Sequence, residues 1–337
     1  MTREAMLYEK TDSEDYVKCA LCAHRCRIGP ADRGICGVRE NRNGALYSLV
    51  YGKIIAENVD PIEKKPLFHV FPGSKSFSIA TVGCNFRCTF CQNHDISQMP
   101  RETGSVFGRQ TTPKDVVENA IRTGSKTIAY TYTEPTIYFE FAYDTAKIAC
   151  EKGLKNVFVT NGFMTEEALE AMSPCLHAAN VDLKAFSDDF YKKRCGGRLQ
   201  PVLESLKKMK SLGIWVEVTT LLIPTLNDSD KELSNIAEFI YSLGAETPWH
   251  ISRFHPRYQM EDLPPTPVAS IHRAAAIGTA SGLKYVYCGN IPGNKGEDSF
   301  CSHCGELLIK RYGFHIEKIN LRGTNCPRCE TSFDGIL

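Results

Sequence analysis

The feature that most constrains the fold is a regular alternation of short apolar runs with amphipathic stretches between residues 76 and 290. The runs have the length and composition of strands, whereas the stretches between them carry apolar residues at helical spacing. Strands separated by helices run parallel and are joined by right-handed crossovers. The strands are predicted at 77–82, 127–132, 156–160, 180–184, 215–223, 249–254 and 285–287.

We therefore predict an α/β fold built as a partial, TIM-like (β/α) barrel with about six core strands. An open doubly wound sheet fits the same pattern. Both architectures place their chemistry at the carboxyl ends of the strands, which is where candidate functional residues are sought. Helices, several of which open with Thr, Ser or Pro as helix starts do, are predicted at 113–123, 138–152, 165–172, 201–212, 229–243 and 267–280.

Cysteine is the unusual component of the composition, with 15 residues in a chain of 337. The amino terminus is polar and acidic and lacks the apolar core of a signal peptide, so we expect a cytoplasmic protein. Because the cytosol keeps thiols reduced, clustered cysteines there indicate metals rather than disulfides. All but four of the cysteines fall into three spaced clusters.

The clusters divide the chain into four predicted parts. Residues 1–45 are a cysteine-rich metal-binding knob, 46–75 an extended connector, 76–297 the partial barrel, and 298–337 a zinc-ribbon-like extension. The formal net charge is +1 without a long basic run, so no dedicated nucleic-acid surface is expected. No apolar stretch is long enough to span a bilayer, so no membrane partner is expected either.

The central cluster, Cys84-x3-Cys88-x2-Cys91, follows directly on the first predicted barrel strand. Three thiolates this close together can hold three corners of a cubane iron–sulfur cluster and leave the fourth iron without a protein ligand. An open iron is what a reaction on a bound ligand requires. A structural zinc site needs a fourth ligand nearby, and His94 is available, so zinc also fits the count.

This spacing, with the aromatic Phe90 just before the last cysteine, resembles the signature of the radical S-adenosylmethionine (radical SAM) superfamily. The resemblance implies a [4Fe-4S] cluster on Cys84, Cys88 and Cys91, whose open iron chelates the amino and carboxylate groups of S-adenosylmethionine. One electron from the cluster then breaks the sulfonium bond, giving methionine and a 5′-deoxyadenosyl radical that takes a hydrogen atom from a substrate. A flavodoxin or ferredoxin is the implied electron donor.

Two strand ends resemble the glycyl-radical activating branch of this superfamily. Where that branch has Gly-Gly-Glu-Pro, which holds an amino group, this chain keeps only Glu-Pro. The role then passes to backbone carbonyls, the Thr133 hydroxyl or the Glu134 carboxylate; a capping Thr beside a solvated Glu is the alternative. Asn161, in a Thr-Asn-Gly turn like that of the branch, is implied to bind ribose or carboxylate, with a plain turn as the alternative.

Later strands add further candidates for binding the cofactor. Alternation puts Asp182 and Lys184 on one face, inside a barrel, where the two charges offset each other near an anionic carboxylate. They match the Asp-x-Lys strand of the family, and a structural ion pair is the alternative. Thr219 shares a strand face with Glu217. His255, at the end of the sixth strand, is a candidate to bind adenine, substrate or a carboxylate, or else a packing residue.

Cys195 is a candidate catalytic residue outside the clusters. It follows the basic run Lys192-Lys193-Arg194. Basic neighbours lower the pKa of a thiol, and a thiol is a good hydrogen-atom donor to a carbon radical. An ordinary loop thiol is the alternative.

The first terminal cluster is Cys19-x2-Cys22-x3-Cys26-x9-Cys36. Its four thiolates suffice for one tetrahedral zinc or one auxiliary iron–sulfur cluster. The compact start of the motif suits either, and zinc is the first choice. Four such cysteines without a metal are not expected in a reducing compartment.

The last cluster consists of two Cys-x2-Cys knuckles, Cys301 with Cys304 and Cys326 with Cys329. A hairpin-like segment separates them, so the region looks like a zinc ribbon, with a rubredoxin-like single iron as the alternative. Its plainest role is to staple a segment too short to fold alone.

The order of motifs over nearly the whole chain resembles the radical enzyme of the AmmeMemoRadiSam group, which is related to pyruvate formate-lyase activating enzymes. This resemblance implies AMMECR-like and Memo-like partners and leaves the substrate open. Besides the triad and the C-terminal knuckles, the runs that carry it are Cys36-Gly37-Val38-Arg39, Asp60-Pro61-Ile62-Glu63-Lys64-Lys65-Pro66-Leu67, Phe254-His255-Pro256 and Gly289-Asn290.

Three functions fit these observations. The first is an oxidoreductase-type radical enzyme that modifies a protein or small molecule in a pathway shared with those partners. The second is activation of a glycyl-radical enzyme by abstraction of a glycine hydrogen. The third is a non-catalytic, metal-bound interaction scaffold, which the open iron of the triad disfavours.

Overall fold

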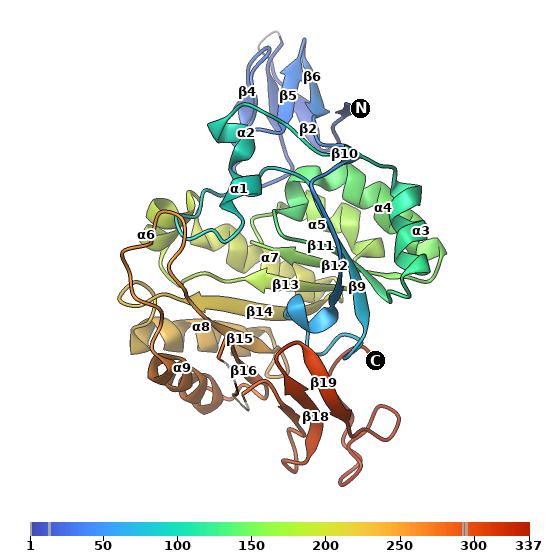
Figure 1. The fold of residues 1–337 in the computed structure, drawn as a ribbon. Helices are drawn as coiled ribbons and strands as arrows, with labels where there is room; N and C mark the ends of the chain where they lie inside the picture. The colour runs from blue at the N-terminus through green and yellow to red at the C-terminus, as the bar shows by residue number, and fades with distance from the viewer. Residues whose placement is uncertain (1, 13–14, 292, 294–295) are drawn as a thin grey trace.

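The computed structural model describes residues 2–12, 15–291, 293 and 296–337. At its centre lies an eight-stranded sheet (Figure 1). All neighbouring strands of this sheet are parallel except the pair β8 and β9, which is antiparallel. In spatial order the strands are β8 (Ala56–Pro61), β9 (Lys75–Ala80), β11 (Thr127–Tyr130), β12 (Lys155–Thr160), β13 (Ala178–Asp182), β14 (Trp215–Leu222), β15 (Trp249–Arg253) and β16 (Val286–Gly289).

Helices join the parallel strands and cover one face of the sheet (Figure 1). No helix among the described residues is long and apolar enough to cross a bilayer. Short 3-10 or π turns are η1 (Ile62–Lys64), η2 (Pro135–Tyr138), η3 (Ser173–Cys175) and η4 (Tyr191–Cys195). The helices are α1 (His94–Ser97), α2 (Met99–Glu102), α3 (Pro113–Arg122), α4 (Phe139–Glu151), α5 (Glu166–Met172), α6 (Asp188–Phe190), α7 (Leu199–Ser211), α8 (Asp230–Leu243) and α9 (Val268–Ala280).

The predicted partial barrel is confirmed. From β9 to β16, each strand of the sheet lies beside the next one along the chain, and the end strands β16 and β8 do not pair within the described part of the chain. Every predicted strand and helix is present, with ends shifted by no more than two residues. Prediction worked because the central strands are buried on both faces and therefore read as continuous apolar runs.

The segment predicted as a connector is part of the barrel. It supplies β8 and then fills the amino-terminal end of the barrel as a floor. The backbone N–H groups of Phe68 and His69 donate to the carboxylate of Glu217 on β14, at 3.0 and 2.9 Å. The Asn180 amide donates to the Pro66 carbonyl at 2.8 Å. These bonds satisfy buried polar groups that an irregular floor would otherwise leave unpaired.

The amino-terminal knob stands over one side of the barrel (Figure 1). A buried ion pair between Arg39 of the knob and Glu140 of α4, at 2.7 Å, ties it to the barrel. The short strands β7 (Lys53–Ile54) and β10 (Arg109–Gln110) pair beside it. The strands of the knob form two sheets, β1 (Arg3–Glu4), β6 (Ala45–Ser48) and β5 (Arg39–Arg42), and β2 (Tyr8–Lys10), β3 (Val17–Cys19) and β4 (Arg27–Ile28).

The carboxy-terminal ribbon lies at the opposite end, against the floor (Figure 1). It is an antiparallel sheet of β17 (Ser299–Phe300), β18 (Leu307–Tyr312) and β19 (His315–Ile319). Phe333 stacks on His69 with ring centroids 4.7 Å apart, and Arg311 donates to the Phe68 carbonyl at 2.8 Å. The ribbon and the floor therefore support each other.

Candidate functional site

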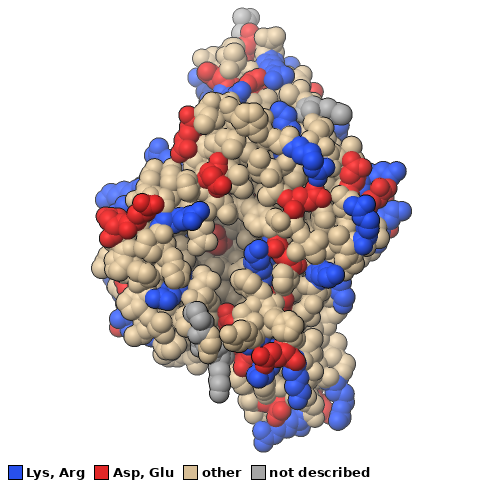
Figure 2. Space-filling view, in the orientation of Figure 1, with Lys and Arg blue, Asp and Glu red and all other residues tan. Residues whose placement is uncertain are grey.

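A cavity of about 580 Å³ occupies the barrel interior. The space-filling view shows a hollow in the middle of this face, with side chains of both charges near its rim (Figure 2). Among the predicted residues, Cys195 and His255 do not line the cavity. The predicted residues that do line it are Cys84, Cys88, Cys91, Thr133, Glu134, Asn161, Asp182, Lys184 and Thr219.

The triad lies on the loop that follows β9, and local contacts shape this loop. The backbone N–H of Phe86 donates to the Cys84 sulfur at 3.3 Å, and the Ser97 hydroxyl lies 3.3 Å from the Cys91 sulfur. Arg101 donates to the carbonyls of Cys84 and Phe86 at 2.8 and 2.9 Å. The loop is thus held with all three thiols at the cavity wall.

His94 does not complete a zinc site with the triad. Its ring stacks on Tyr258 with centroids 4.3 Å apart. Among the described residues, only the four C-terminal cysteines form a group whose potential ligand atoms all lie within 4.8 Å of one another. The triad therefore presents three thiols without a fourth protein ligand at zinc spacing.

Glu134 is buried and organises two neighbouring strand ends. One carboxylate oxygen accepts from the Thr136 hydroxyl at 2.6 Å and the Thr160 hydroxyl at 2.7 Å. The other accepts from the backbone N–H of Asn161 at 2.8 Å. Burial raises the pKa of Glu134, and these hydrogen bonds oppose that shift. The alternative of a solvated Glu is thus excluded, and Glu134 positions the turns around the cavity.

Tyr132 stands in the turn after β11, where the related branch has glycine, and has a left-handed backbone with φ 61°. That conformation costs a non-glycine residue about 1–2 kcal/mol. The Tyr132 hydroxyl is held by the Asp60 carboxylate, and the Lys65 ammonium lies 4.5 Å from its ring centroid. Asn93, beside the triad, donates to the Tyr132 carbonyl at 2.7 Å. Contacts to other segments thus hold a turn that glycine would form without strain.

Asn161 connects the end of β12 to the triad loop. Its amide donates to the Asn85 side-chain oxygen at 2.7 Å, and its nitrogen lies 3.8 Å from the Cys84 sulfur. Its own side-chain oxygen accepts from the Phe163 backbone at 3.0 Å. Asn161 therefore does more than form a turn, because it orients a residue next to a triad cysteine.

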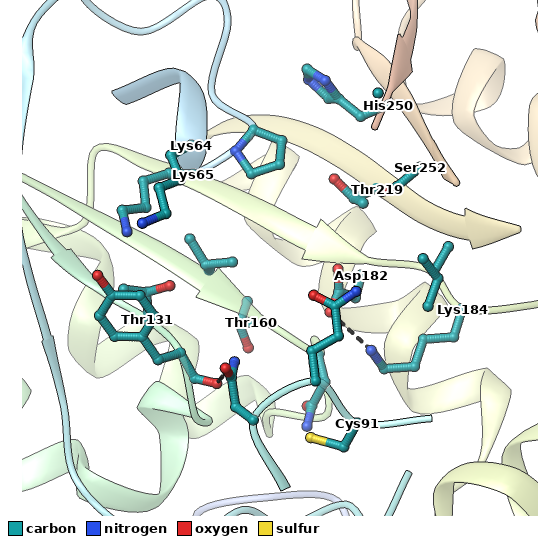
Figure 3. Close-up of a pocket in the computed structure, with 18 of the residues that line it drawn as sticks. Lys64, Lys65, Cys91, Thr131, Thr160, Asp182, Lys184, Thr219, His250 and Ser252 are labelled. Atoms are coloured by element: carbon teal, nitrogen blue, oxygen red, sulfur yellow. Dashed lines mark hydrogen bonds and ion pairs between the residues drawn. The ribbon is translucent and has the colours of Figure 1, made fainter. Parts of the chain in front are cut away.

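Asp182 and Lys184 form an ion pair of 2.8 Å beside the triad (Figure 3). The strand β13 ends at Asp182, so Lys184 reaches the cavity from the following loop rather than from the strand. Burial opposes the charge of Lys184, but attraction by Asp182 and then by the thiols of Cys88 and Cys195 raises the pKa of Lys184 well above its usual value. Lys184 therefore presents a fixed positive charge to the cavity.

Thr219 lies on the far wall, with His250 and Ser252 of β15 beyond it (Figure 3). The Thr219 hydroxyl oxygen is buried and finds no hydrogen-bond partner within the described part of the chain. The His250 ring nitrogen lies 2.6 Å from the Glu217 carboxylate. An unpartnered buried hydroxyl at a cavity wall is suited to bind a polar ligand atom.

Sequence reasoning assigned no role to Lys64 and Lys65, which also line the cavity (Figure 3). Both ammonium groups bind Asp60, at 2.9 and 2.6 Å. Burial lowers the pKa of Lys65 to about 8, although Asp60 opposes the shift. In the sequence, only the Glu-Lys-Lys run itself could have indicated a site here. Strand positions give no hint, because these residues precede the parallel strands and reach the cavity through the floor.

Two predicted site residues, Cys195 and His255, do not line the cavity. Cys195 is fully buried next to the triad loop, where its carbonyl accepts from the Arg87 backbone at 2.8 Å. A hydrogen bond with the Cys195 thiol, followed by burial, raises the pKa of Cys88 well above its usual value. Cys195 thus contacts a triad cysteine without lining the cavity, and its role as a hydrogen-atom donor stays a prediction. His255 is exposed because β15 already ends at Arg253; His250, on the strand itself, lines the cavity.

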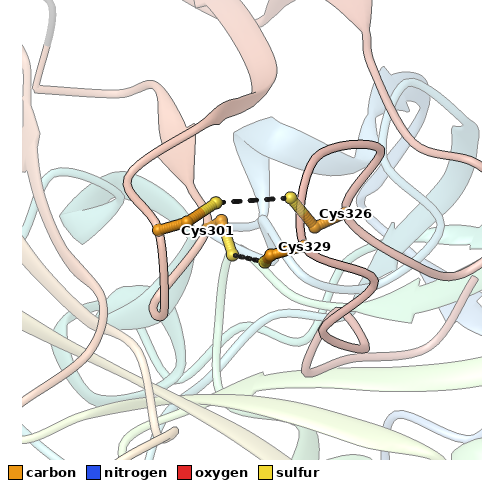
Figure 4. A group of neighbouring side chains, drawn as sticks. Cys301, Cys326 and Cys329 are labelled. Atoms are coloured by element: carbon orange, nitrogen blue, oxygen red, sulfur yellow. Dashed lines mark hydrogen bonds between the residues drawn. The ribbon is translucent and has the colours of Figure 1, made fainter.

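The four C-terminal cysteines meet at one point (Figure 4). The sulfurs of Cys301 and Cys329 are 3.5 Å apart, and those of Cys304 and Cys326 are 3.7 Å apart. Tetrahedral zinc with Zn–S bonds of about 2.3 Å would separate its sulfurs by roughly 3.8 Å. The group can therefore hold a single metal ion.

The four N-terminal cysteines also meet, but differently. Together they line a second, smaller cavity between the knob and the barrel. They do not form a group of ligand atoms within 4.8 Å, although all four belong to the described residues. Burial raises the pKa of the Cys36 thiol to about 11.

This chain is similar in sequence and in fold to several known proteins. The family model of the radical SAM superfamily matches residues 78–240. The uncharacterized protein MJ0808 of Methanocaldococcus jannaschii is 48% identical over 99% of this chain and 100% of its own length. The pyruvate formate-lyase-activating enzyme of Clostridium pasteurianum is 25% identical over 48% of this chain and 67% of that protein. A radical SAM methyltransferase from Sphaerobacter thermophilus has a similar fold, with a TM-score of 0.53 and 15% identity over 91% of this chain and 81% of that chain.

Proposed function

We propose that this chain is a radical SAM enzyme, since the family model of that superfamily matches residues 78–240, and that it holds a [4Fe-4S] cluster on Cys84, Cys88 and Cys91 and cleaves S-adenosylmethionine reductively. The observation that carries the proposal is the placement of all three thiols on the wall of one cavity, beside a fixed charge pair. Three thiols without a fourth protein ligand suit a cluster with one open iron. With the cofactor bound, the site would supply a 5′-deoxyadenosyl radical.

In this proposal, residues of the chain bind S-adenosylmethionine and orient it. Lys184 and the unpartnered Thr219 hydroxyl are suited to an anionic carboxylate, and Asp182 to an amino group. The turn after β11, held by Glu134, offers backbone carbonyls to the same amino group. The lining residues from Cys84 to His250 are largely buried, so the barrel walls exclude water and stray hydrogen donors.

The far half of the cavity, lined by Lys64, Lys65, His250 and Ser252, is the proposed substrate region. Its two ammonium groups both pair with Asp60, and the carboxylates of Glu63 and Glu297 also line the cavity. A flavodoxin or ferredoxin remains the proposed electron donor, and AMMECR-like and Memo-like proteins remain proposed partners in a cytoplasmic pathway. For the C-terminal group we propose zinc, because its sulfur spacing suits a single tetrahedral ion.

The test is anaerobic reconstitution, reduction with dithionite and incubation with S-adenosylmethionine, followed by chromatography for 5′-deoxyadenosine. We expect product from the wild type and none from Cys88→Ala. Cys175→Ala, which changes a cysteine outside the three clusters, is the matched control and should retain product. Zinc in the triad, or a full cluster that yields no product with any proposed partner, would overturn the proposal.

A second candidate is activation of a glycyl-radical enzyme, which the similarity to the Clostridium pasteurianum enzyme favours. The turn after β11 differs from that branch at Tyr132 and Thr133 but keeps Glu134. Incubating the loaded protein with a pyruvate formate-lyase should then give the electron paramagnetic resonance (EPR) signal of a glycyl radical. Product formation without that signal would separate the first function from the second.

A further inference from the structure

Like the triad, the N-terminal group of Cys19, Cys22, Cys26 and Cys36 does not bring its ligand atoms within 4.8 Å of one another, whereas the C-terminal group does. Tetrahedral zinc would bring its sulfurs to roughly 3.8 Å from one another, as the C-terminal thiols already lie. The sulfurs on an iron–sulfur cluster stand farther apart, because they bind different irons that sulfide bridges separate. This spacing therefore does not suit zinc, the metal that was predicted first for these four cysteines.

A buried arginine lines the same small cavity and has hydrogen-bond donors without a partner among the described residues. Arg39 is 1% exposed and lines the cavity with the four cysteines. One of its terminal nitrogens binds Glu140 and the Met6 carbonyl, at 2.7 and 2.6 Å. Its Nε and its other terminal nitrogen have no partner among the described residues. Unpaired buried N–H groups are costly, so an acceptor is expected in the cavity.

The cavity also adjoins the triad loop. A Cβ on Gly83, the residue before Cys84, would lie 3.2 Å from the Cys36 carbonyl. Arg101 donates to the carbonyls of both Ile35 and Cys84, at 2.7 and 2.8 Å. His24, between the second and third cysteines, lies 2.8 Å from the Asn85 carbonyl. One wall of protein thus separates the N-terminal thiols from the triad.

We propose that Cys19, Cys22, Cys26 and Cys36 hold a second iron–sulfur cluster, ligated on all four sides by protein and hydrogen-bonded by Arg39. The thiolates and cluster sulfides would accept hydrogen bonds from the two unpartnered Arg39 nitrogens, and the guanidinium would offset the negative charge of the ligated cluster. With four thiolates the cluster has no open iron, so it binds no S-adenosylmethionine. The proposal does not rest on the reaction at the triad.

The test removes the triad from the full-length protein, as Cys84→Ala/Cys88→Ala/Cys91→Ala, produced and purified anaerobically. We expect this variant to retain about half of the wild-type iron and sulfide and to give an EPR signal on reduction with dithionite. Adding Cys22→Ala and Cys36→Ala should remove the remaining iron. Adding Cys175→Ala instead should leave it in place.

A protein without the triad that carries zinc at this site and no iron would overturn the proposal. Where that variant does not fold, Cys22→Ala/Cys36→Ala in the otherwise intact chain gives the same information. Its iron should fall by about half while the iron of the triad remains. Unchanged iron, with a loss of zinc, would also overturn the proposal. Both readouts are metal contents, so they are independent of whether 5′-deoxyadenosine forms.

Discussion

The two ends of the chain each carry four cysteines and begin with the same Cys-x2-Cys unit, yet the tertiary structure uses them differently. The C-terminal thiols lie 3.5 and 3.7 Å apart in pairs, at the tip of a small ribbon with a core of a few side chains. The N-terminal thiols stand farther apart, around a cavity that a buried arginine shares. The ligand atoms of the C-terminal group lie within 4.8 Å of one another, whereas the N-terminal cysteines line a cavity.

The surroundings explain the difference. The ribbon has a core of only a few buried residues, so an ion on its four thiols would supply much of its stability. The N-terminal cysteines instead lie where the knob meets the barrel. The backbone of Cys22 forms an isolated β-bridge with Met164 of the barrel, and Arg39 of the knob pairs with Glu140 of α4. All four cysteines belong to the knob, at the place where it packs against the barrel. Ligand count alone therefore does not specify a metal.

The largest expected effect is loss of the ribbon in Cys301→Ala/Cys304→Ala. Structural zinc contributes about 10–16 kcal/mol in zinc-finger peptides, more than a segment of this size can replace. We expect residues 298–337 to become sensitive to protease and the zinc content to fall, while iron is retained. A protease-resistant ribbon in the zinc-free variant would contradict the comparison.

The next largest effect is expected from mild oxidation with ferricyanide, which should distinguish the metal of the N-terminal group from that of the C-terminal group. Zinc has no redox chemistry, whereas iron–sulfur clusters change their oxidation state and are dismantled when overoxidised. Iron should leave the triad and the N-terminal group while zinc stays on Cys301, Cys304, Cys326 and Cys329. Metal analysis before and after treatment measures this. Release of zinc from both ends, in equal amounts, would break the comparison.

A smaller effect is expected for Arg101→Met, which removes bonds to the carbonyls of Ile35, Cys84 and Phe86. Charged hydrogen bonds of this kind contribute about 2 kcal/mol each. The Tm should fall, and iron retention should drop at both the triad and the N-terminal group without any loss of zinc. Arg122→Met, on the exposed end of α3, is the matched control. If only the triad loses iron, the shared wall is not what holds the N-terminal group.

The smallest effect is expected for Phe314→Ala, at the turn between β18 and β19. This side chain is half-exposed and lines the edge of the barrel cavity, so the ribbon reaches the site as well as the floor. We expect a KM for S-adenosylmethionine or substrate that rises about two- to fivefold, roughly 0.5–1 kcal/mol. Zinc and iron contents should stay constant. An unchanged KM would make the ribbon a purely structural element.

Much of the fold could be read from local pattern. The strands and helices of the barrel follow from apolar periodicity, since each central strand is buried on both faces. The triad could be predicted for a related reason: its three cysteines lie within eight residues, so the covalent chain itself brings them together. Residues at strand ends, such as Asp182 and Asn161, were found because parallel strands expose one common edge.

Other parts of the site depend on distances that no local pattern contains. His255 was predicted from strand alternation, but β15 ends at Arg253, and alternation says nothing beyond the last strand residue. Cys195 has basic neighbours in sequence, yet the fold buries it against Cys88. Lys64 and Lys65 reach the cavity only because the segment before the barrel folds back as its floor.

The sequence by itself determined the barrel, the triad and the presence of two further thiol groups, because periodicity and short spacing act along the chain. Only the tertiary structure decided what each thiol group can hold. The four N-terminal cysteines line one cavity with Arg39, which pairs with Glu140 and keeps two nitrogens without a partner among the described residues. The pairing of Arg39 with Glu140 arises from packing between distant segments, which spacing along the chain does not encode.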